Sequence, residues 1–192
     1  MMKRLFGTLV CLVMWNVCFA GPFGLSIGMT LEEVTEACGG REPVRLENDD
    51  RYLIEPEKRH SMFEHYAARI DDAQGLYYIW AISRDIFTSG YGAEIRSAFS
   101  ALESSLSKSY GKPTKRIDEV APDSYWTDEK YWMRALSQGA RTLAAGWEDN
   151  LPNGLSGVYL GAQAEYDSEG FIVLYYEFEN HELVESAEDE VL

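Results

Sequence analysis

The chain has 192 residues, with 17 Lys or Arg against 32 Asp or Glu, and its formal net charge is −15 at pH 7. So many carboxylates repel nucleic-acid phosphates and anionic lipid surfaces, which argues against both classes of partner. The same charge favours a partner with a basic surface, or it serves solubility alone.

Residues 1–20 have the pattern of a secretory signal peptide. Two basic residues form a positive start, residues 5–13 are apolar but too few to cross a bilayer, and small side chains precede a cleavage point. We expect cleavage between Ala20 and Gly21. The mature protein would then be periplasmic or secreted, without a membrane-spanning segment.

Cleavage would leave Cys38 as the last of three cysteines, so the mature chain could form no internal disulfide. Such a chain depends on its hydrophobic core, and roughly 170 residues are enough to build one. Cys38 itself lies on the apolar side of a predicted helix, where we expect a buried thiol.

That helix has a strong start signal near the beginning of the mature chain. Thr30 is a good N-cap, Glu33 completes a capping box with it, and Met29 and Val34 can form a hydrophobic staple. The glycines at 39–40 supply a left-handed stop. We therefore expect a helix between this cap and these glycines.

Ser26 lies in a literal G-x-S-x-G, the pattern around the nucleophile of many hydrolases. Such a nucleophile needs a strand directly before it and a helix directly after it, because the strained turn exposes the hydroxyl. Only residues 21–25 precede Ser26 after cleavage, and the helix cap comes four residues later, at Thr30. We interpret Ser26 as a loop or edge-strand residue.

The next part of the chain predicts a strand near 44–47 and then a hairpin. Its strands cover 63–70 and 76–83, and its turn, 72–75, has the Asp-x-x-Gly pattern of a type I turn closed by a left-handed glycine. Both faces of the second strand are apolar, so we expect it to be central and covered on both sides.

The second half begins with the longest predicted helix, 93–110, whose apolar residues recur at helical spacing. A further helix, 128–138, is expected to be capped by Thr127. The remaining predicted strands cover 141–148, 157–166 and 171–179, of which the last two form a hairpin.

An internal similarity links the two halves. Residues 37–47 and 109–119 both run from a helix end through glycine, proline and a basic residue into a strand, and the turns at 72–75 and 167–170 share Asp-x-x-Gly. We expect an α+β fold with helices packed on an antiparallel sheet and two diverged helix-strand-hairpin units. The expected divisions are 21–86, 87–180 with an inserted helix near 120–139, and an acidic tail, 181–192.

The histidines do not predict a metal site. His60 and His65 are five residues apart, which places them on opposite faces of a strand and off helical spacing. His181 lies in the tail. The sequence also has no phosphate-binding loop and no metal-binding motif, so we predict neither a cofactor nor a metal.

Aromatic residues are the best candidates for a binding surface, because Trp and Tyr dominate interface hot spots. Tyr125 and Trp126 could anchor a partner from the exposed edge of the insertion. The complete candidate set is Trp80, Tyr125, Trp126, Trp147 and Tyr175.

Residues 27–43, with the sequence IGMTLEEVTEACGGREP, resemble the N-terminal helix of small bacterial envelope modules of the SmpA/OmlA type. The matching residues are Gly28, Met29, Thr30, Glu33, Val34, Gly40 and Pro43, with one extra residue near the glycines. The resemblance implies helices packed on an antiparallel sheet, and two such units in tandem resemble the β-lactamase inhibitor protein fold. These families act by binding, which implies no catalytic residues. The chain lacks their lipid-anchor cysteine, which argues against a role in outer-membrane assembly.

Our functional hypothesis is an exported periplasmic protein-binding module, acting as an inhibitor, an immunity protein or an envelope accessory protein, without catalysis. One alternative is a small secreted hydrolase that uses Ser26 or a carboxylate pair. Another is a carrier of a small ligand or lipid between helix and sheet. The sequence leaves the oligomeric state open.

Overall fold

The computed structural model describes residues 21–47 and 49–189. The predicted signal peptide and the last three residues of the predicted acidic tail lie outside the described residues. Within these ranges, no helix has both the length and the apolar composition needed to span a membrane.

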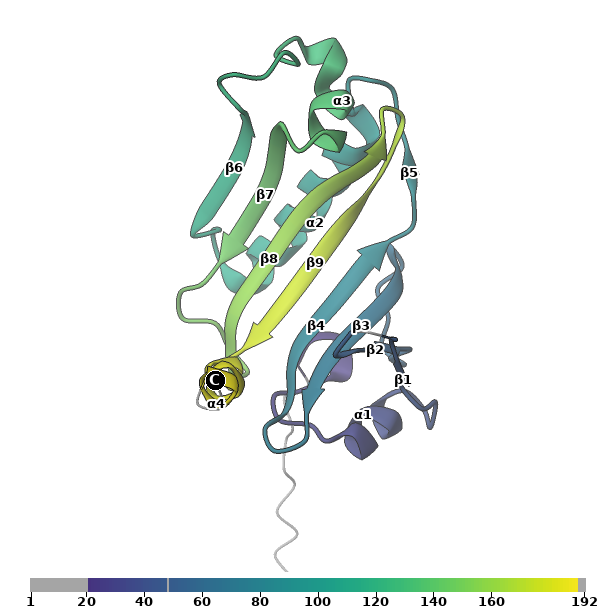
Figure 1. Cartoon of the computed structure of the whole chain (residues 1–192), viewed down its shortest axis with the longest axis vertical. Coiled ribbons are helices and arrows are strands. Elements are labelled where there is room, and N and C mark those ends of the chain that lie inside the picture. Colours follow the sequence, from purple (N-terminus) through teal and green to yellow (C-terminus); the bar gives the residue numbers. More distant parts are fainter. Residues whose placement is uncertain (1–20, 48, 190–192) are drawn as a thin grey trace, which may run out of the picture.

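One antiparallel sheet dominates the fold (Figure 1). In the described part of the chain it has nine strands, with the order β1-β2-β3-β4-β9-β8-β7-β6, and the short β5 pairs with β9. The strands are β1 (Val44–Arg45), β2 (Arg51–Ile54), β3 (Phe63–Asp71), β4 (Gly75–Ser83), β5 (Ile86–Phe87), β6 (Lys115–Val120), β7 (Arg141–Trp147), β8 (Leu155–Tyr166) and β9 (Glu169–Phe178).

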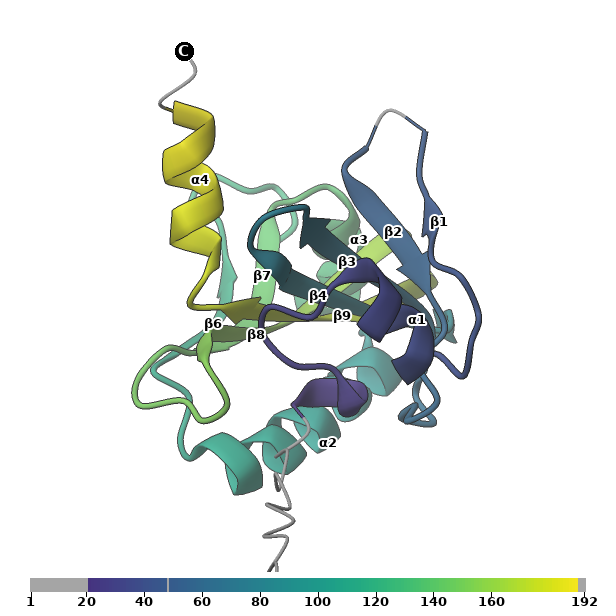
Figure 2. The ribbon, with the colours of Figure 1, turned by 90° about the horizontal axis from the view of Figure 1, so that it is seen from below.

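The helices are distributed unequally over the two faces of this sheet. They are α1 (Leu31–Ala37), α2 (Ala93–Tyr110), α3 (Trp132–Ser137) and α4 (His181–Asp189), with short 3-10 helices at Pro22–Gly24 and Glu129–Tyr131. Figure 2 shows α1 and α2 on one side, which we call the helix face, whereas α4 and the β1–β2 hairpin project to the other side. This other side is the open face. The α+β class is therefore confirmed.

The hydrophobic core lies between the helices and the helix face. The predicted apolar stripe of α2 is buried there at Ile95, Phe99, Leu102 and Leu106. Burying side chains of this size stabilises a fold by about 1.5–3 kcal/mol each. Cys38 is also buried, as expected, and desolvation raises the pKa of its thiol.

The capping box of α1 forms as predicted. The Thr30 hydroxyl accepts a hydrogen bond from the Glu33 amide at 3.3 Å, and the Glu33 carboxylate accepts one from the Thr30 amide at 2.8 Å. These bonds satisfy amide groups that the first turn of a helix leaves without partners.

The second strand of the first hairpin differs from the prediction. Strand β4 is central, but on the open face α4 reaches only its first residues, where the His181 ring lies 6.2 Å from that of Tyr78, and Trp80 stays half-exposed, so the prediction of cover on both sides is wrong for the rest of the strand. A β-bulge moves the register from Arg69↔Tyr78 to Ile70↔Leu76. Leu76 therefore joins the core, whereas Tyr78 and Trp80 lie half-buried on the open face.

Two other elements also need correction. The helical segment after residue 127 begins with a 3-10 turn whose N-cap is Asp128 rather than Thr127, because the Asp128 carboxylate accepts a hydrogen bond from the Lys130 amide at 3.1 Å. Residues 181–189, expected in the tail, form α4 instead. Two hydrogen bonds anchor this helix, because the Asn180 amide group donates to the carbonyls of Gln74 at 2.8 Å and Leu76 at 3.1 Å.

Candidate functional site

The candidate site is a row of side chains that crosses the open face from strand to strand. Residues that are directly opposite in neighbouring antiparallel strands point to the same face of a sheet. The register therefore aligns seven residues, namely Leu53, Ala67, Trp80, Tyr175, Tyr159, Gly146 and Lys115. We call Trp80, Tyr175 and Tyr159, at the centre of this line, the aromatic row.

Neighbouring side chains fix Trp80 in place. Its ring stacks on Tyr78 at 5.0 Å between centroids and meets Tyr175 edge-on at 6.1 Å. The guanidinium groups of Arg69 and Arg51 lie 5.4 and 5.8 Å from the indole ring. Such aromatic and cation–π contacts have specific geometries and add to the stabilisation from burial. Trp80 is thus held in one orientation while remaining half-exposed.

Tyr159 lies flat on the sheet because glycines stand beside it. A Cβ atom at Gly157 would lie 2.4 Å from the Tyr159 ring, and one at Gly146 would lie 3.3 Å from it. Burial, helped by the nearby carboxylates of Glu177 and Glu148, raises the pKa of Tyr159 to about 12. The hydroxyl therefore stays protonated at neutral pH and remains able to donate a hydrogen bond.

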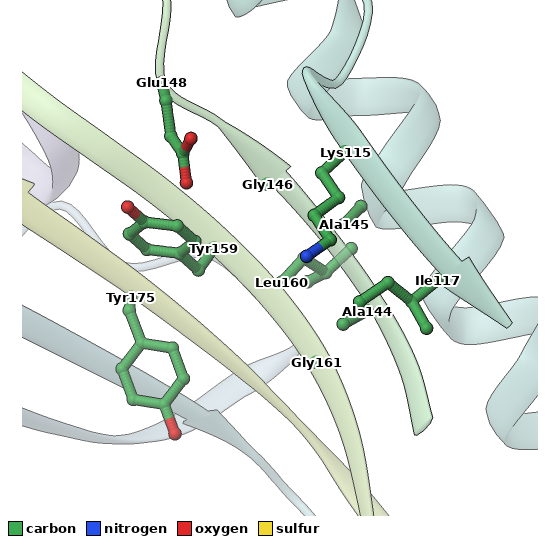
Figure 3. Close-up of a pocket in the computed structure, with 10 residues that line it drawn as sticks. All are labelled: Lys115, Ile117, Ala144, Ala145, Gly146, Glu148, Tyr159, Leu160, Gly161 and Tyr175. Atoms are coloured by element: carbon green, nitrogen blue, oxygen red, sulfur yellow. The ribbon is translucent and has the colours of Figure 1, made fainter. Parts of the chain in front are cut away.

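A hollow of about 310 Å³ opens beside the aromatic row (Figure 3). Its floor is made by small residues of β7 and β8, namely Ala144, Gly146 and Gly161. Tyr159 and Tyr175 form one wall, and the side chains of β6 form the other. Lys115 places a cation at one rim and Glu148 places a carboxylate at the opposite rim. The hollow has room for one mainly apolar or aromatic side chain. A polar group at the end of that side chain would lie near Lys115 or Glu148.

Beside Tyr78, the Glu177 carboxylate is held by three groups on the open face. It accepts hydrogen bonds from the Tyr78 hydroxyl and from Ser156 Oγ at 3.0 Å, and His181 Nε2 lies 3.1 Å from it. His181 Nδ1 lies 3.0 Å from the Phe178 carbonyl. Each of these polar groups already has a partner, so the cluster ties α4 to the sheet rather than presenting a free base.

Trp80 and Tyr175 are the two predicted binding residues that the structure brings together. Trp147 needs correction, because it follows Gly146 along β7 and so points to the helix face. Only 1% of it is exposed, and its indole nitrogen donates to the Gly111 carbonyl at 2.9 Å. This tryptophan belongs to the core.

Tyr125 and Trp126 belong to the segment between β6 and α3, and this segment lies at the end of the molecule that carries α3 (Figure 1). Tyr125 is 94% exposed. Trp126 is half-buried, because it packs edge-on against Tyr131 at 5.3 Å and the Arg134 guanidinium lies 5.3 Å from its ring. These contacts stabilise the insertion locally.

Sequence reasoning missed Tyr159 and the small residues around it. A signal was present, because Gly157, Tyr159 and Gly161 alternate along a predicted strand and so share one face. Glycine at alternate positions of a strand often marks the close approach of another group. The pairing that brings Tyr159 beside Tyr175 was not visible in the sequence.

Ser26 does not have the surroundings of an activated nucleophile. Its Oγ atom is buried and has no hydrogen-bond partner in the described structure, and its backbone amide donates to the Met29 sulfur at 3.4 Å. A nucleophilic serine requires a base within hydrogen-bonding distance. Nor do the described residues contain any group of three or more His, Cys, Asp or Glu side chains placed to hold a metal ion.

In comparisons with known proteins, no family model, curated sequence or solved structure matches the chain. The geometry of the open face is therefore the basis for any functional conclusion.

Proposed function

We propose that this protein is an exported periplasmic protein-binding module that uses the aromatic row and the adjoining hollow to hold another protein, without catalysis. It would act as an inhibitor, an immunity protein or an envelope accessory protein. The observation that carries this proposal is the row of fixed, half-exposed aromatic rings on the open face of the sheet.

A protein partner fits this surface better than a small ligand does. Half-exposed Tyr and Trp rings provide a large contact area, and rings that are already fixed lose little conformational entropy on binding. The hollow is open to the sheet surface and lies on the open face, not between helix and sheet. Such a hollow suits one anchoring side chain of a larger partner.

The charge of the chain supports a partner with a basic or mixed surface. The formal net charge of −15 attracts positive groups over distances set by the ionic strength. Charges at the rim of an interface mainly raise the association rate. We therefore expect association to slow as salt is added, while the aromatic contacts keep the complex bound.

We also propose that the two halves are diverged copies of one unit. The strand order runs β1 to β4 from one edge and β6 to β9 from the other, so the β3–β4 and β8–β9 hairpins meet at the centre. Helices α1 and α2 each precede one of these strand sets. This arrangement supports the tandem resemblance and the binding role that it implies.

The experiment is capture of exported proteins on the immobilised mature chain at low salt, followed by titration of each captured protein. Trp80→Ala and Tyr159→Ala should weaken binding by about 2 kcal/mol or more, as is usual at a hot spot. Tyr125→Ala is the matched control, because it removes an exposed aromatic ring elsewhere. Equal binding by all three variants, or no captured protein at low salt, would contradict the proposal.

Export is tested separately. The mass of the protein recovered from the periplasm should correspond to a chain that begins at Gly21. A full-length chain retained in the cytoplasm would contradict export and leave the binding surface to be tested with cytoplasmic proteins.

A further inference from the structure

Strand β6 forms one outer margin of the sheet (Figure 1). It pairs with β7 along its whole length, and no described strand pairs with its other edge. An edge strand presents unpaired amide and carbonyl groups that can accept another strand. Natural proteins usually block such an edge with charges, so the charge pattern on β6 decides what it can accept.

The backbone groups that face outward can be identified from the register. The Ala121 amide donates to the Ala140 carbonyl at 2.7 Å, at the end of the β6–β7 ladder. Hydrogen-bonded positions alternate in an antiparallel ladder, so Lys115, Ile117 and Glu119 direct their backbone groups toward β7. The backbone groups of Arg116 and Asp118 therefore face outward.

The charges on β6 reverse their sign about its centre. Lys115 and Arg116 precede Ile117, and Asp118 and Glu119 follow it. A strand blocked by charge of one sign repels every copy of itself. A strand with opposite charges on the two sides of its centre attracts a second copy that runs in the opposite direction.

We propose that two copies of this protein pair through β6, antiparallel, about a two-fold axis at Ile117 that is perpendicular to the sheet. The outward backbone groups of Arg116 then bond with those of Asp118 in the second copy, and the reverse pair forms by symmetry. Lys115 lies opposite Glu119 of the second copy. Ile117 lies opposite itself as a non-hydrogen-bonded pair, in which side chains come closest.

The charges select this register over its neighbours. Moving the axis by one residue would place Arg116 opposite a second Arg116, or Asp118 opposite a second Asp118. Like charges directly opposite each other destabilise a strand pair. Only the axis at Ile117 brings every charged residue of β6 opposite an unlike charge.

The open-face charges are available for this pairing. In the described structure, the side chains of Lys115 and Glu119 are exposed and make no hydrogen bond or ion pair within the chain. On the helix face, Arg116 and Asp118 already bind Glu103 at 3.0 Å and Arg141 at 2.8 Å, respectively. Lys115 and Glu119 are therefore the pair that a second copy would complete, and the pair to change in a test.

Pairing would also place two hollows beside the two-fold axis, because Lys115 and Ile117 form one wall of each hollow. The contact itself is small, and interfaces below about 1,200 Å² belong to the weak, transient class. We therefore expect a dimer whose population rises with protein concentration. It does not depend on the partner binding proposed for the open face.

The test is analytical ultracentrifugation of the mature chain over a wide concentration range. Wild-type protein should shift reversibly from monomer to dimer. Lys115→Glu and Glu119→Lys each place like charges opposite one another twice per dimer and should weaken dimerisation by about tenfold or more. Lys108→Glu on α2, an exposed position with the same charge change, should dimerise like wild type.

Two complementary samples identify the register. The double variant Lys115→Glu/Glu119→Lys restores opposite charges and should dimerise again. An equimolar mixture of the two single variants should form a heterodimer, because each lysine again faces a glutamate. Amide exchange of Arg116 and Asp118 in wild type should slow as concentration rises. A wild-type monomer at every concentration, or failure of both complementary samples to dimerise, would overturn the proposal.

Discussion

At the scale of single residues, two glycines of β8 have different roles. Gly157 leaves room for the Tyr159 ring, whereas Gly161 forms part of the floor of the hollow. A Cβ atom at Gly157 would collide with the Tyr159 ring at 2.4 Å, whereas one at Gly161 would meet nothing within 4 Å. Both glycines lie on the open face of the same strand.

We predict that Gly157→Ala destabilises the fold by about 1–3 kcal/mol, because the Tyr159 ring must leave its position. Gly161→Ala should leave stability nearly unchanged while narrowing the floor of the hollow, and so should weaken partner binding. Urea unfolding and binding titration measure the two effects. Equal destabilisation by both substitutions would contradict this account of the hollow.

Tyr159 also predicts a pH dependence. Burial raises its pKa to about 12 in the folded state, above the usual value near 10. The folded state therefore holds this proton more tightly than the unfolded chain does. Its contribution to stability is fully present below about pH 10 and is lost as the pH rises toward about 12. The midpoint of urea unfolding should fall across this window, and Tyr159→Phe should make the fall shallower. An unchanged slope in Tyr159→Phe would contradict the raised pKa.

At the scale of elements, the Asn180 side chain anchors the start of α4, beside the contact of His181 with Glu177. Asn180 is buried, and its amide group bonds to two carbonyls at the start of β4. We predict that Asn180→Ala destabilises the fold by about 1–3 kcal/mol, because both carbonyls lose a buried partner. It should also speed amide exchange throughout α4. Ser186→Ala, at an exposed position on the same helix, is the control. Exchange in α4 that is equal in both variants would show that other contacts hold this helix.

The sequence predicted those elements correctly that are determined by residues close together in the chain. The Thr30–Glu33 capping box and the apolar stripe of α2 involve residues close in sequence, and both formed as expected. The bulge near Tyr78 was missed, because it depends on how β4 meets β3 and β9. Strand β2 was missed as well, since its polar segment shows no clear alternation and becomes a strand through pairing with β3.

At the scale of the whole molecule, the two halves share one sheet and one core. Strands β4 and β9 pair from Tyr78↔Glu177 to Ile82↔Val173. The buried cluster includes Val34 from α1 and Phe99 from α2. Neither half can unfold without exposing the apolar surface of the other.

We therefore predict a single cooperative unfolding transition. Circular dichroism and tryptophan fluorescence should give coincident curves, as expected for a two-state domain. Trp80→Phe leaves tryptophans only in the second half of the described chain, so its fluorescence should follow the same curve. Two separate transitions would show that the halves are independent domains.

The sequence by itself determined the local elements: the capped first helix, the two Asp-x-x-Gly hairpins, the long amphipathic helix and the acidic charge. The charge follows from the composition alone. The helices and hairpins follow from contacts between residues that are near in the chain, and the energies of these contacts do not depend on the rest of the fold. Only the tertiary structure decided that Trp80, Tyr175 and Tyr159 share one row, that Trp147 is buried, and that β6 forms an edge. Each of these depends on strand order and register. Pairing between distant segments and burial of one face of the sheet together fix this order and register.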